Sequence, residues 1–148
     1  MKDFDYYIKE GSVKRQSVDV ELAKSLKDDA MLRAEKVVKL PVKEFSKIIF
    51  ENVYDALREL LDAVLALEGY KSYSHEASIA YLKKFGVEDS LLAELDSFRY
   101  KRNSSKYYGK SLSGEDAEAI MYFYDKQSVK IIKIIEQLCI KLNNRAKK

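Results

Sequence analysis

The chain has 148 residues, of which 47% are hydrophobic and 34% are charged, and this composition fits one folded domain and argues against a disordered chain. One proline and five glycines are too few for the turns of a β-rich fold, so we expect long helices with short connections. The single cysteine, Cys139, excludes an internal disulfide framework, and the net charge of +3 does not by itself indicate a nucleic-acid-binding protein.

Residues 1–16 contain no apolar segment of a secretory signal, and no part of the chain approaches the ~20 consecutive apolar residues that span a bilayer. We therefore expect a cytoplasmic protein with no membrane association. The same 16 residues lack a clean hydrophobic period, which indicates a tail or a segment that docks onto the body.

The first predicted helix begins near Ser17, a suitable N-cap residue ahead of Asp19 and Glu21, whose charges favour a first turn. Its apolar residues recur every three or four positions and share one face: Val18, Leu22, Leu26, Ala30, Ala34 and Val37. Pro41 ends this helix, because proline breaks the backbone hydrogen bonding of a helix interior.

The strongest helical pattern runs from residue 42 to about residue 68, and Gly69 is its natural C-terminal stop. One face is continuously apolar: Phe45, Ile49, Val53, Ala56, Leu60, Val64 and Leu67. A shorter helix follows over residues 74–85, where Ser74 is the expected cap and Gly86 the end.

Two further helices complete the pattern. One starts at Asp89 or Ser90, buries Leu91, Leu95 and Phe98, and frays after Arg102 and before Gly109. The last starts at Ser113, in a run that resembles a capping box, and continues for about 30 residues. The sequence thus predicts an all-α fold, an up-and-down bundle of about five helices in one domain over residues 17–145.

The titratable side chains offer few catalytic patterns. Four carboxylates lie on one side of the predicted 42–68 helix, where a solvated face is the ordinary interpretation: Glu51, Asp55, Glu59 and Asp62. His75 is the only histidine, which excludes a histidine-rich zinc site, and at a helix start it favours a capping or surface role. The chain also lacks a glycine-rich phosphate loop, so we predict no metal and no cofactor.

The segment from residue 99 to residue 110 is unlike the rest of the chain, because it is basic and rich in tyrosine and contains no acidic residue. Its cations are Arg99, Lys101, Arg102, Lys106 and Lys110, and its tyrosines are Tyr100, Tyr107 and Tyr108. Cations of this kind contact phosphates, and tyrosine rings stack on unpaired bases. A basic solvated turn is the alternative interpretation.

Arg102 carries the most information in this segment. It occupies the next position on the stripe formed by Leu91, Leu95 and Phe98, so a continuing helix would turn its guanidinium toward the core or a groove. A buried charge needs a partner, which could be a carboxylate of the bundle, a second subunit or a bound phosphate.

The order of these features resembles the HEPN family, in particular small prokaryotic members whose motif ends in Tyr-Gly. The resemblance covers roughly residues 17–142 and rests on the long helix, Gly69-Tyr70, Ser74-His75-Glu76, Arg102-Asn103 and Tyr108-Gly109. It implies a helical bundle that forms a homodimer, pairs with a minimal nucleotidyltransferase in a toxin–antitoxin or defence system, and binds RNA or nucleotide phosphate.

Many members of this family are metal-independent endoribonucleases with an Arg, a polar residue and then a His. Here Arg102 and Asn103 match the first part, but Tyr107, Tyr108 or Gly109 stands where the His belongs. A phenol is a poor base at neutral pH, so we expect phosphate binding at Arg102 with little or no cleavage.

Two alternatives stay open. One is an endoribonuclease in which Tyr107, Tyr108 or a spatially close His75 replaces the missing His. The other is a generic helical interaction scaffold, in which the basic segment and the C-terminal tail bind phosphates by charge alone; this tail contains Lys141, Arg145, Lys147 and Lys148.

Overall fold

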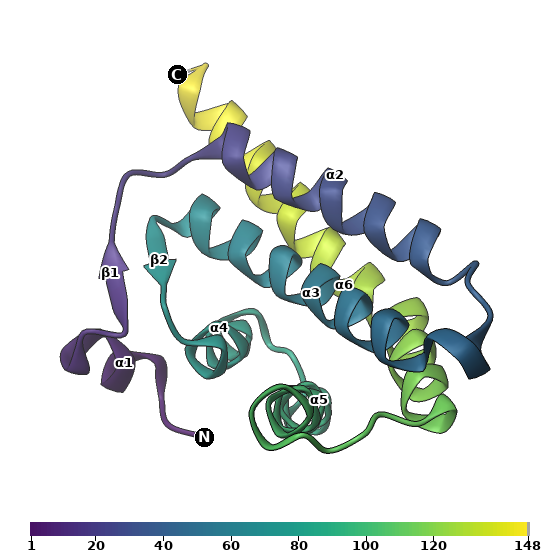
Figure 1. Ribbon diagram of the computed structural model, residues 1–148. Helices are drawn as coiled ribbons and strands as arrows, with labels where there is room; N and C mark the ends of the chain where they lie inside the picture. Colours follow the sequence, from purple (N-terminus) through teal and green to yellow (C-terminus); the bar gives the residue numbers. More distant parts are fainter. Residues whose placement is uncertain (148) are drawn as a thin grey trace.

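The computed structural model describes residues 1–147, which form six α-helices and a two-stranded sheet (Figure 1). The elements in chain order are α1 (Phe4–Glu10), β1 (Val13–Arg15), α2 (Val20–Val37), α3 (Val42–Glu68), β2 (Tyr70–Ser72), α4 (His75–Tyr81), the 3-10 helix η1 (Leu82–Phe85), α5 (Asp89–Tyr108) and α6 (Gly114–Ala146). The all-α prediction is confirmed, but the helix count is corrected from about five to six.

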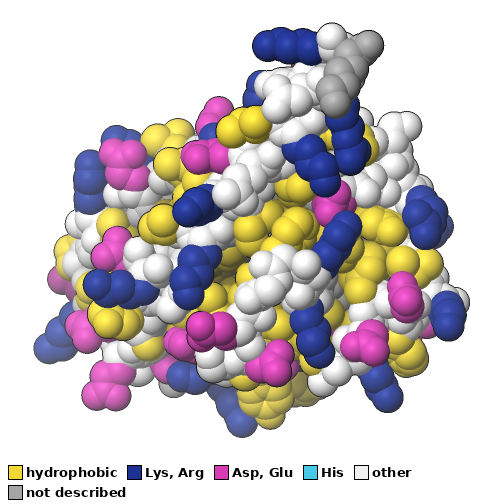
Figure 2. Space-filling model, turned by 180° about the vertical axis from the view of Figure 1, so that it is seen from behind, with side chains coloured by type: hydrophobic (Ala, Val, Ile, Leu, Met, Phe, Trp, Pro, Cys, Tyr) yellow, Lys and Arg dark blue, Asp and Glu magenta, His cyan; other side chains and the backbone are white. Residues whose placement is uncertain are grey.

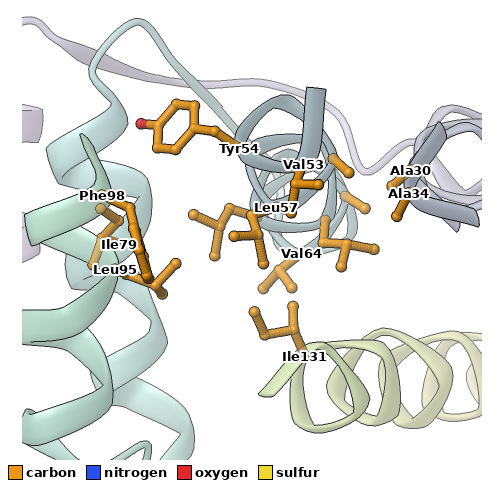
Figure 3. Packing of buried hydrophobic residues seen from close by; sticks show 14 of the residues in the cluster. Ala30, Ala34, Val53, Tyr54, Leu57, Val64, Ile79, Leu95, Phe98 and Ile131 are labelled. Carbon is orange, nitrogen blue, oxygen red and sulfur yellow. The ribbon is translucent and has the colours of Figure 1, made fainter. Parts of the chain in front are cut away.

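Helix α3 is the centre of the molecule. Helices α2 and α6 pack along it, while α4 and α5 cover another side, with α4 beside its middle and C-terminal part (Figure 1). Alanines Ala30 and Ala34 of α2 are buried against α3, and their small side chains let the two helices approach closely. Figure 3 shows residues from α3 meeting Ile79 of α4, Leu95 and Phe98 of α5, and Ile131 of α6 in one continuous core.

The helix ends follow the capping rules, with two corrections. Gly69 ends α3 in the left-handed region with φ +81°, and Ser113 forms a capping box with Asp116, as the sequence predicts. Helix α2 begins at Val20 and not near Ser17, because the side chain of Asp19 accepts the capping hydrogen bond from the Leu22 N–H. Helix α5 continues past Arg102 to Tyr108 without fraying.

The first 15 residues dock onto the helical bundle. This is one of the two arrangements that the sequence allowed for this segment, the other being a loose tail. Tyr7 of α1 and Val13 of β1 are buried, and β1 pairs antiparallel with β2 in the register Val13↔Ser72. The sequence pattern missed both elements, because a helix of seven residues and a strand of three are too short to show a period.

Charged side chains of both signs are interspersed over the surface, and hydrophobic side chains gather around a hollow on the face shown in Figure 2. Cys139 is a free thiol, partly buried against the core. Within residues 1–147, none of the helices combines the length and the apolar composition that crossing a bilayer requires.

Candidate anion-binding site

Arg102 lies on the core-facing side of α5, and its side chain is only 12% exposed. Its Nη2 atom is 3.4 Å from Oδ1 of Asp55 on α3, and its guanidinium carbon is 5.5 Å from the centre of the Tyr54 ring. The Nε atom is buried and has no hydrogen-bond partner within residues 1–147. Arg102 thus has a carboxylate of its own bundle as partner, but through one long contact that leaves part of its donor capacity unused.

Tyr54 connects this arginine to the only histidine of the chain. The Tyr54 hydroxyl lies 3.2 Å from Nδ1 of His75, and the two rings are 6.1 Å apart. Figure 3 shows the Tyr54 ring reaching from α3 across toward α4, with its hydroxyl at the far end. His75, at the first position of α4, is therefore half-buried beside Tyr54 and does not have the capping or surface role expected for it; Ser74 is the cap.

The electrostatics around His75 are strongly positive. Burial, followed by the charges of Arg58, Arg102, Arg99 and Lys106 in that order, lowers the pKa of His75 from 6.5 to about 4. Burial also raises the pKa of the Tyr54 phenol to about 12, against the opposing effect of Arg102. At neutral pH both side chains are therefore uncharged, and the positive charge of the site belongs to the four surrounding cations.

These four cations are only partly neutralised. Arg99 donates from Nε to Asp96 at 2.7 Å and lies 3.8 Å from Glu76, and Arg102 has its long contact with Asp55. Neither Arg58 nor Lys106 has a carboxylate within ion-pair distance in the described part of the chain. Arg58 also interacts with the charge of Asp62, four residues further along α3. Four carboxylates thus lie near the four cations, and the feature that favours an anion is the buried Arg102 Nε, which has no hydrogen-bond partner within residues 1–147.

Because α5 is helical, the basic residues of the segment 99–110 lie on different sides of it. Arg99, Arg102 and Lys106 are spaced three and four residues apart, so they share one side of α5, and the charges of all three act on His75. The Nζ atom of Lys106 also lies 5.6 Å from the centre of the Tyr107 ring. Lys101 lies on another side, where it forms a 2.8 Å ion pair with Asp116 of α6, and Lys110 follows the end of α5. Of the five predicted phosphate-binding residues, the structure therefore brings three together.

The other predicted catalytic residues lie at the margin of this cluster. Tyr107 and Tyr108 are exposed in the last turn of α5, at 66% and 80%. At 3.6 residues per turn they are rotated about 120–140° from Arg102, so their side chains point away from its guanidinium. Asn103 is half-buried on the next position after Arg102, and none of the described hydrogen bonds involves its side chain.

The acidic side of α3 differs from the solvated face that the sequence predicts. Arg33 of α2 bridges Asp29 and Glu59, with both N–O distances 3.0 Å. Burial, together with the neighbouring carboxylate of Asp29, raises the pKa of Glu59 to about 7 against the opposing charge of Arg33. Burial also raises the pKa of Asp62. Glu59 and Asp55 therefore pair with arginines of other helices, whereas Glu51 lies 3.9 Å from Lys47 of α3 itself. Within residues 1–147 no group of three metal-binding side chains occurs.

Sequence reasoning missed three members of the site: Tyr54, Arg58 and the participation of His75. Tyr54 and Arg58 are four residues apart on α3, so they lie on one side of that helix, and this spacing was a usable signal. The approach of α4 to that side depends on tertiary packing, which local spacing does not encode.

Comparisons with protein-family models, with curated proteins and with solved structures find no match to this chain. The resemblance to HEPN proteins therefore rests on the sequence pattern, and the functional argument rests on the geometry of the site.

Proposed function

We propose that this protein binds phosphate groups of RNA or nucleotides at the cluster of Arg58, Arg99, Arg102 and Lys106. The observation that carries the proposal is the buried Nε of Arg102, which is without a hydrogen-bond partner in the described chain and lies among three further cations that act on His75. A phosphate accepts hydrogen bonds from several donors at once, and the buried Arg102 Nε, which lacks a partner in the described chain, is one such donor.

The contact between Arg102 and Asp55 is compatible with this function. At 3.4 Å the contact is longer than a charge-assisted hydrogen bond, which is ~2.7–2.9 Å. A phosphate oxygen could therefore compete with Asp55 for the guanidinium. An arginine held by two short hydrogen bonds to a carboxylate would instead favour a purely structural role.

The binding test is fluorescence anisotropy with a labelled single-stranded RNA over a range of salt concentrations. We expect binding that weakens steeply with salt, and an Arg102→Ala variant that loses at least about tenfold in affinity. The matched control is Arg145→Ala, which removes an exposed arginine in the last turn of α6, far along the chain from the cluster. Equal losses in the two variants would favour the generic scaffold that binds by charge alone.

The single histidine gives a direct reporter of the site. An NMR titration of the His75 ring carbon follows one imidazole without assignment ambiguity. We expect an unliganded pKa near 4 and a pKa that rises when inorganic phosphate or RNA occupies the cluster, because a nearby anion stabilises the imidazolium. An imidazole pKa that ignores saturating phosphate and RNA would contradict the proposed site.

A second candidate function is metal-independent RNA cleavage, which the hydrogen bond between Tyr54 and His75 favours. In one tautomer, Nδ1 of His75 carries its proton toward the Tyr54 oxygen, and Nε2 is then left as the base. In this reaction Nε2 removes the proton of a ribose 2′-OH, the 2′-oxygen bonds to phosphorus, and the bond to the 5′-oxygen breaks while this oxygen takes a proton from water. The products are a 2′,3′-cyclic phosphate and a 5′-hydroxyl, and Arg102 holds the phosphate throughout.

The low pKa of His75 limits this reaction, because a weak base removes a proton slowly at pH 7. We therefore propose binding as the main function and cleavage as a slow activity. Mass spectrometry of RNA incubated with wild type, His75→Ala and Tyr107→Phe separates the alternatives. Cyclic-phosphate products that vanish only in His75→Ala would support this candidate, and products that persist in all three would point to a contaminating nuclease.

We further propose that the protein is an HEPN-like module that forms a homodimer and acts with a nucleotidyltransferase partner in a toxin–antitoxin or defence system. Apolar side chains are exposed on the outer side of α6, including Tyr122, Val129 and Ile140, which supports an interface there. Sedimentation over micromolar concentrations tests the dimer, and a strict monomer would contradict it. Co-purification with a nucleotidyltransferase encoded beside it tests the pairing.

A further inference from the structure

A second concave site lies beside the cationic cluster. It is a cavity of about 620 Å³ between the first residues of the chain, β2, α4 and α5, which is within the ~300–1,000 Å³ of small-molecule sites. Three aromatic rings from separate elements line it: Phe4, Tyr70 and Tyr81. Phe4 packs edge-to-face against Tyr70 and Tyr81, with centroid distances of 5.2 and 4.5 Å and interplanar angles of 80° and 65°, so the aromatic wall is made of mutually inclined rings and not of one flat face.

The rim of this cavity carries charges of both signs. Within residues 1–147, Lys2 and Lys83 have no ion pair, and the carboxylates of Asp3, Asp5 and Asp89 have neither an ion pair nor a side-chain hydrogen bond. Lys84, in contrast, is held by Glu68 at 2.8 Å. A small anion would be repelled by the free carboxylates, and a purely apolar ligand would use none of these groups. A planar ring that carries amine donors would use both the aromatic wall and the carboxylates.

The cavity and the cationic cluster follow one another along α5. Asp96 lines the cavity and also accepts the 2.7 Å hydrogen bond from Arg99, which belongs to the cluster. Arg102 follows Asp96 by six residues, which is about 9 Å along the helix axis and about 120° around it, so Arg99 lies between the cavity and Arg102. Tyr7 of α1 is also close to the cluster, because Glu76 and Arg99 both act on its phenol. The N-terminal segment therefore borders the cavity and approaches the cluster.

We propose that this cavity binds an amine-bearing nucleobase of a single-stranded RNA, next to the phosphate that Arg102 holds. The base lies against the wall of Phe4, Tyr70 and Tyr81, and its exocyclic amine donates to a rim carboxylate such as Asp89. Uracil has no exocyclic amine, so the site disfavours it. This inference rests on the proposed function for the position of the phosphate, but the cavity can be tested without any phosphate.

The first experiment uses nucleosides, which carry no phosphate. Adenosine, cytidine and uridine are titrated to millimolar concentrations into the full chain, and backbone NMR shifts are followed. We expect shifts at residues lining the cavity, with adenosine and cytidine binding at least about fivefold more tightly than uridine, and no change in Arg102→Ala. Asp89→Asn, an exposed position in the first turn of α5, should reduce the preference without disturbing the fold. Equal binding of the three nucleosides, or no shifts at the cavity, would overturn the inference.

The second experiment places the base relative to the phosphate. Short RNAs that carry one abasic position at each site in turn are bound to wild type and to Phe4→Leu, and circular dichroism checks the fold of the variant. We expect one abasic position to lose at least about fivefold in affinity with wild type and much less with Phe4→Leu, because the variant has already lost part of the aromatic wall.

The two proposals fail in different ways. If every abasic position binds alike while Arg102→Ala still abolishes binding, the base cavity is wrong and the phosphate site stands. If no RNA binds but adenosine shifts the cavity residues, the proposed function fails, and with it the adjacent phosphate, while a nucleoside site remains.

Discussion

The two sides of α3 are built on different principles. Toward α2 and α6, α3 presents aliphatic and alanine side chains that are almost fully buried, with Ala56 and Ala63 inaccessible to solvent. Toward α4 and α5, its middle turns present Tyr54 and Asp55, which contact His75 and Arg102, and Arg58, whose charge acts on His75. The first side derives its stability from apolar burial. The second includes buried or half-buried polar groups that are incompletely paired, which is a common property of binding sites.

The largest loss of stability is expected from a substitution on the apolar side of α3. Ile49 is fully buried in α3, whereas its neighbour Ile48 is 48% exposed on the same helix. We expect Ile49→Ala to lower the free energy of unfolding by about 3–4 kcal/mol, since it loses burial and leaves a cavity. Ile48→Ala should lower it by less than about 1 kcal/mol. Urea denaturation of the two variants measures the difference, and equal losses would show that α3 is not packed as described.

The next largest loss of stability is expected at Gly69, at the C-terminal end of α3. Gly69 has φ +81°, and a Cβ at this position would lie 3.0 Å from the backbone oxygen of Gln16, whose N–H donates to the Gly69 carbonyl. We expect Gly69→Ala to lower the free energy of unfolding by about 2 kcal/mol, because the backbone strain and the close contact add. Gly86→Ala is the control, with a similar φ of +74° and open space around it. If the two variants have the same melting temperature, the close contact with Gln16 does not contribute to the loss of stability.

A smaller change in the free energy of unfolding is expected from His75, on the polar side of α3, and it depends on pH. The pKa of His75 is about 4 in the folded protein and close to 6.5 when unfolded, so between these values only the unfolded chain binds the proton. The contribution of His75 to stability is therefore complete above pH 6.5 and is lost as the pH falls toward 4. We expect a loss of about 2 kcal/mol, which allows for solvent screening of a half-buried group.

The control for this prediction is His75→Gln, which cannot titrate. Glu59 acts in the opposite direction, because its folded pKa of about 7 lies above the usual value and its contribution is lost as the pH rises through that range. The difference between wild type and His75→Gln in urea denaturation at pH 4, 5, 6 and 7 isolates the histidine. A difference that stays constant with pH would mean that the pKa of His75 is not lowered.

The same contrast explains what the sequence could predict. Helices α2, α3 and α6 are long and periodic, so their apolar faces identify them, and Gly69 and Ser113 mark their ends by local chemistry. For α5 the periodicity predicts only the inward side of Arg102, which continues the stripe of Leu91, Leu95 and Phe98. The approach of His75 to Tyr54 did not follow, because it joins residues 21 positions apart through the packing of α4. Lys101 was grouped with the site only because the segment was considered as a composition and not as a helix.

The first 15 residues are held to the bundle less strongly than the long helices are held to one another. The segment is held by a seven-residue helix and three strand pairs, and a two-stranded sheet of this length is marginal by itself. We therefore regard α1 and β1 as a separate unit of opening, whose amide hydrogens exchange faster than those of α3. When this unit opens, one wall of the aromatic cavity leaves with Phe4 while the arginines on α3 and α5 stay in place. Opening of the N-terminal segment therefore dismantles the aromatic cavity but leaves the arginine cluster on α3 and α5 intact.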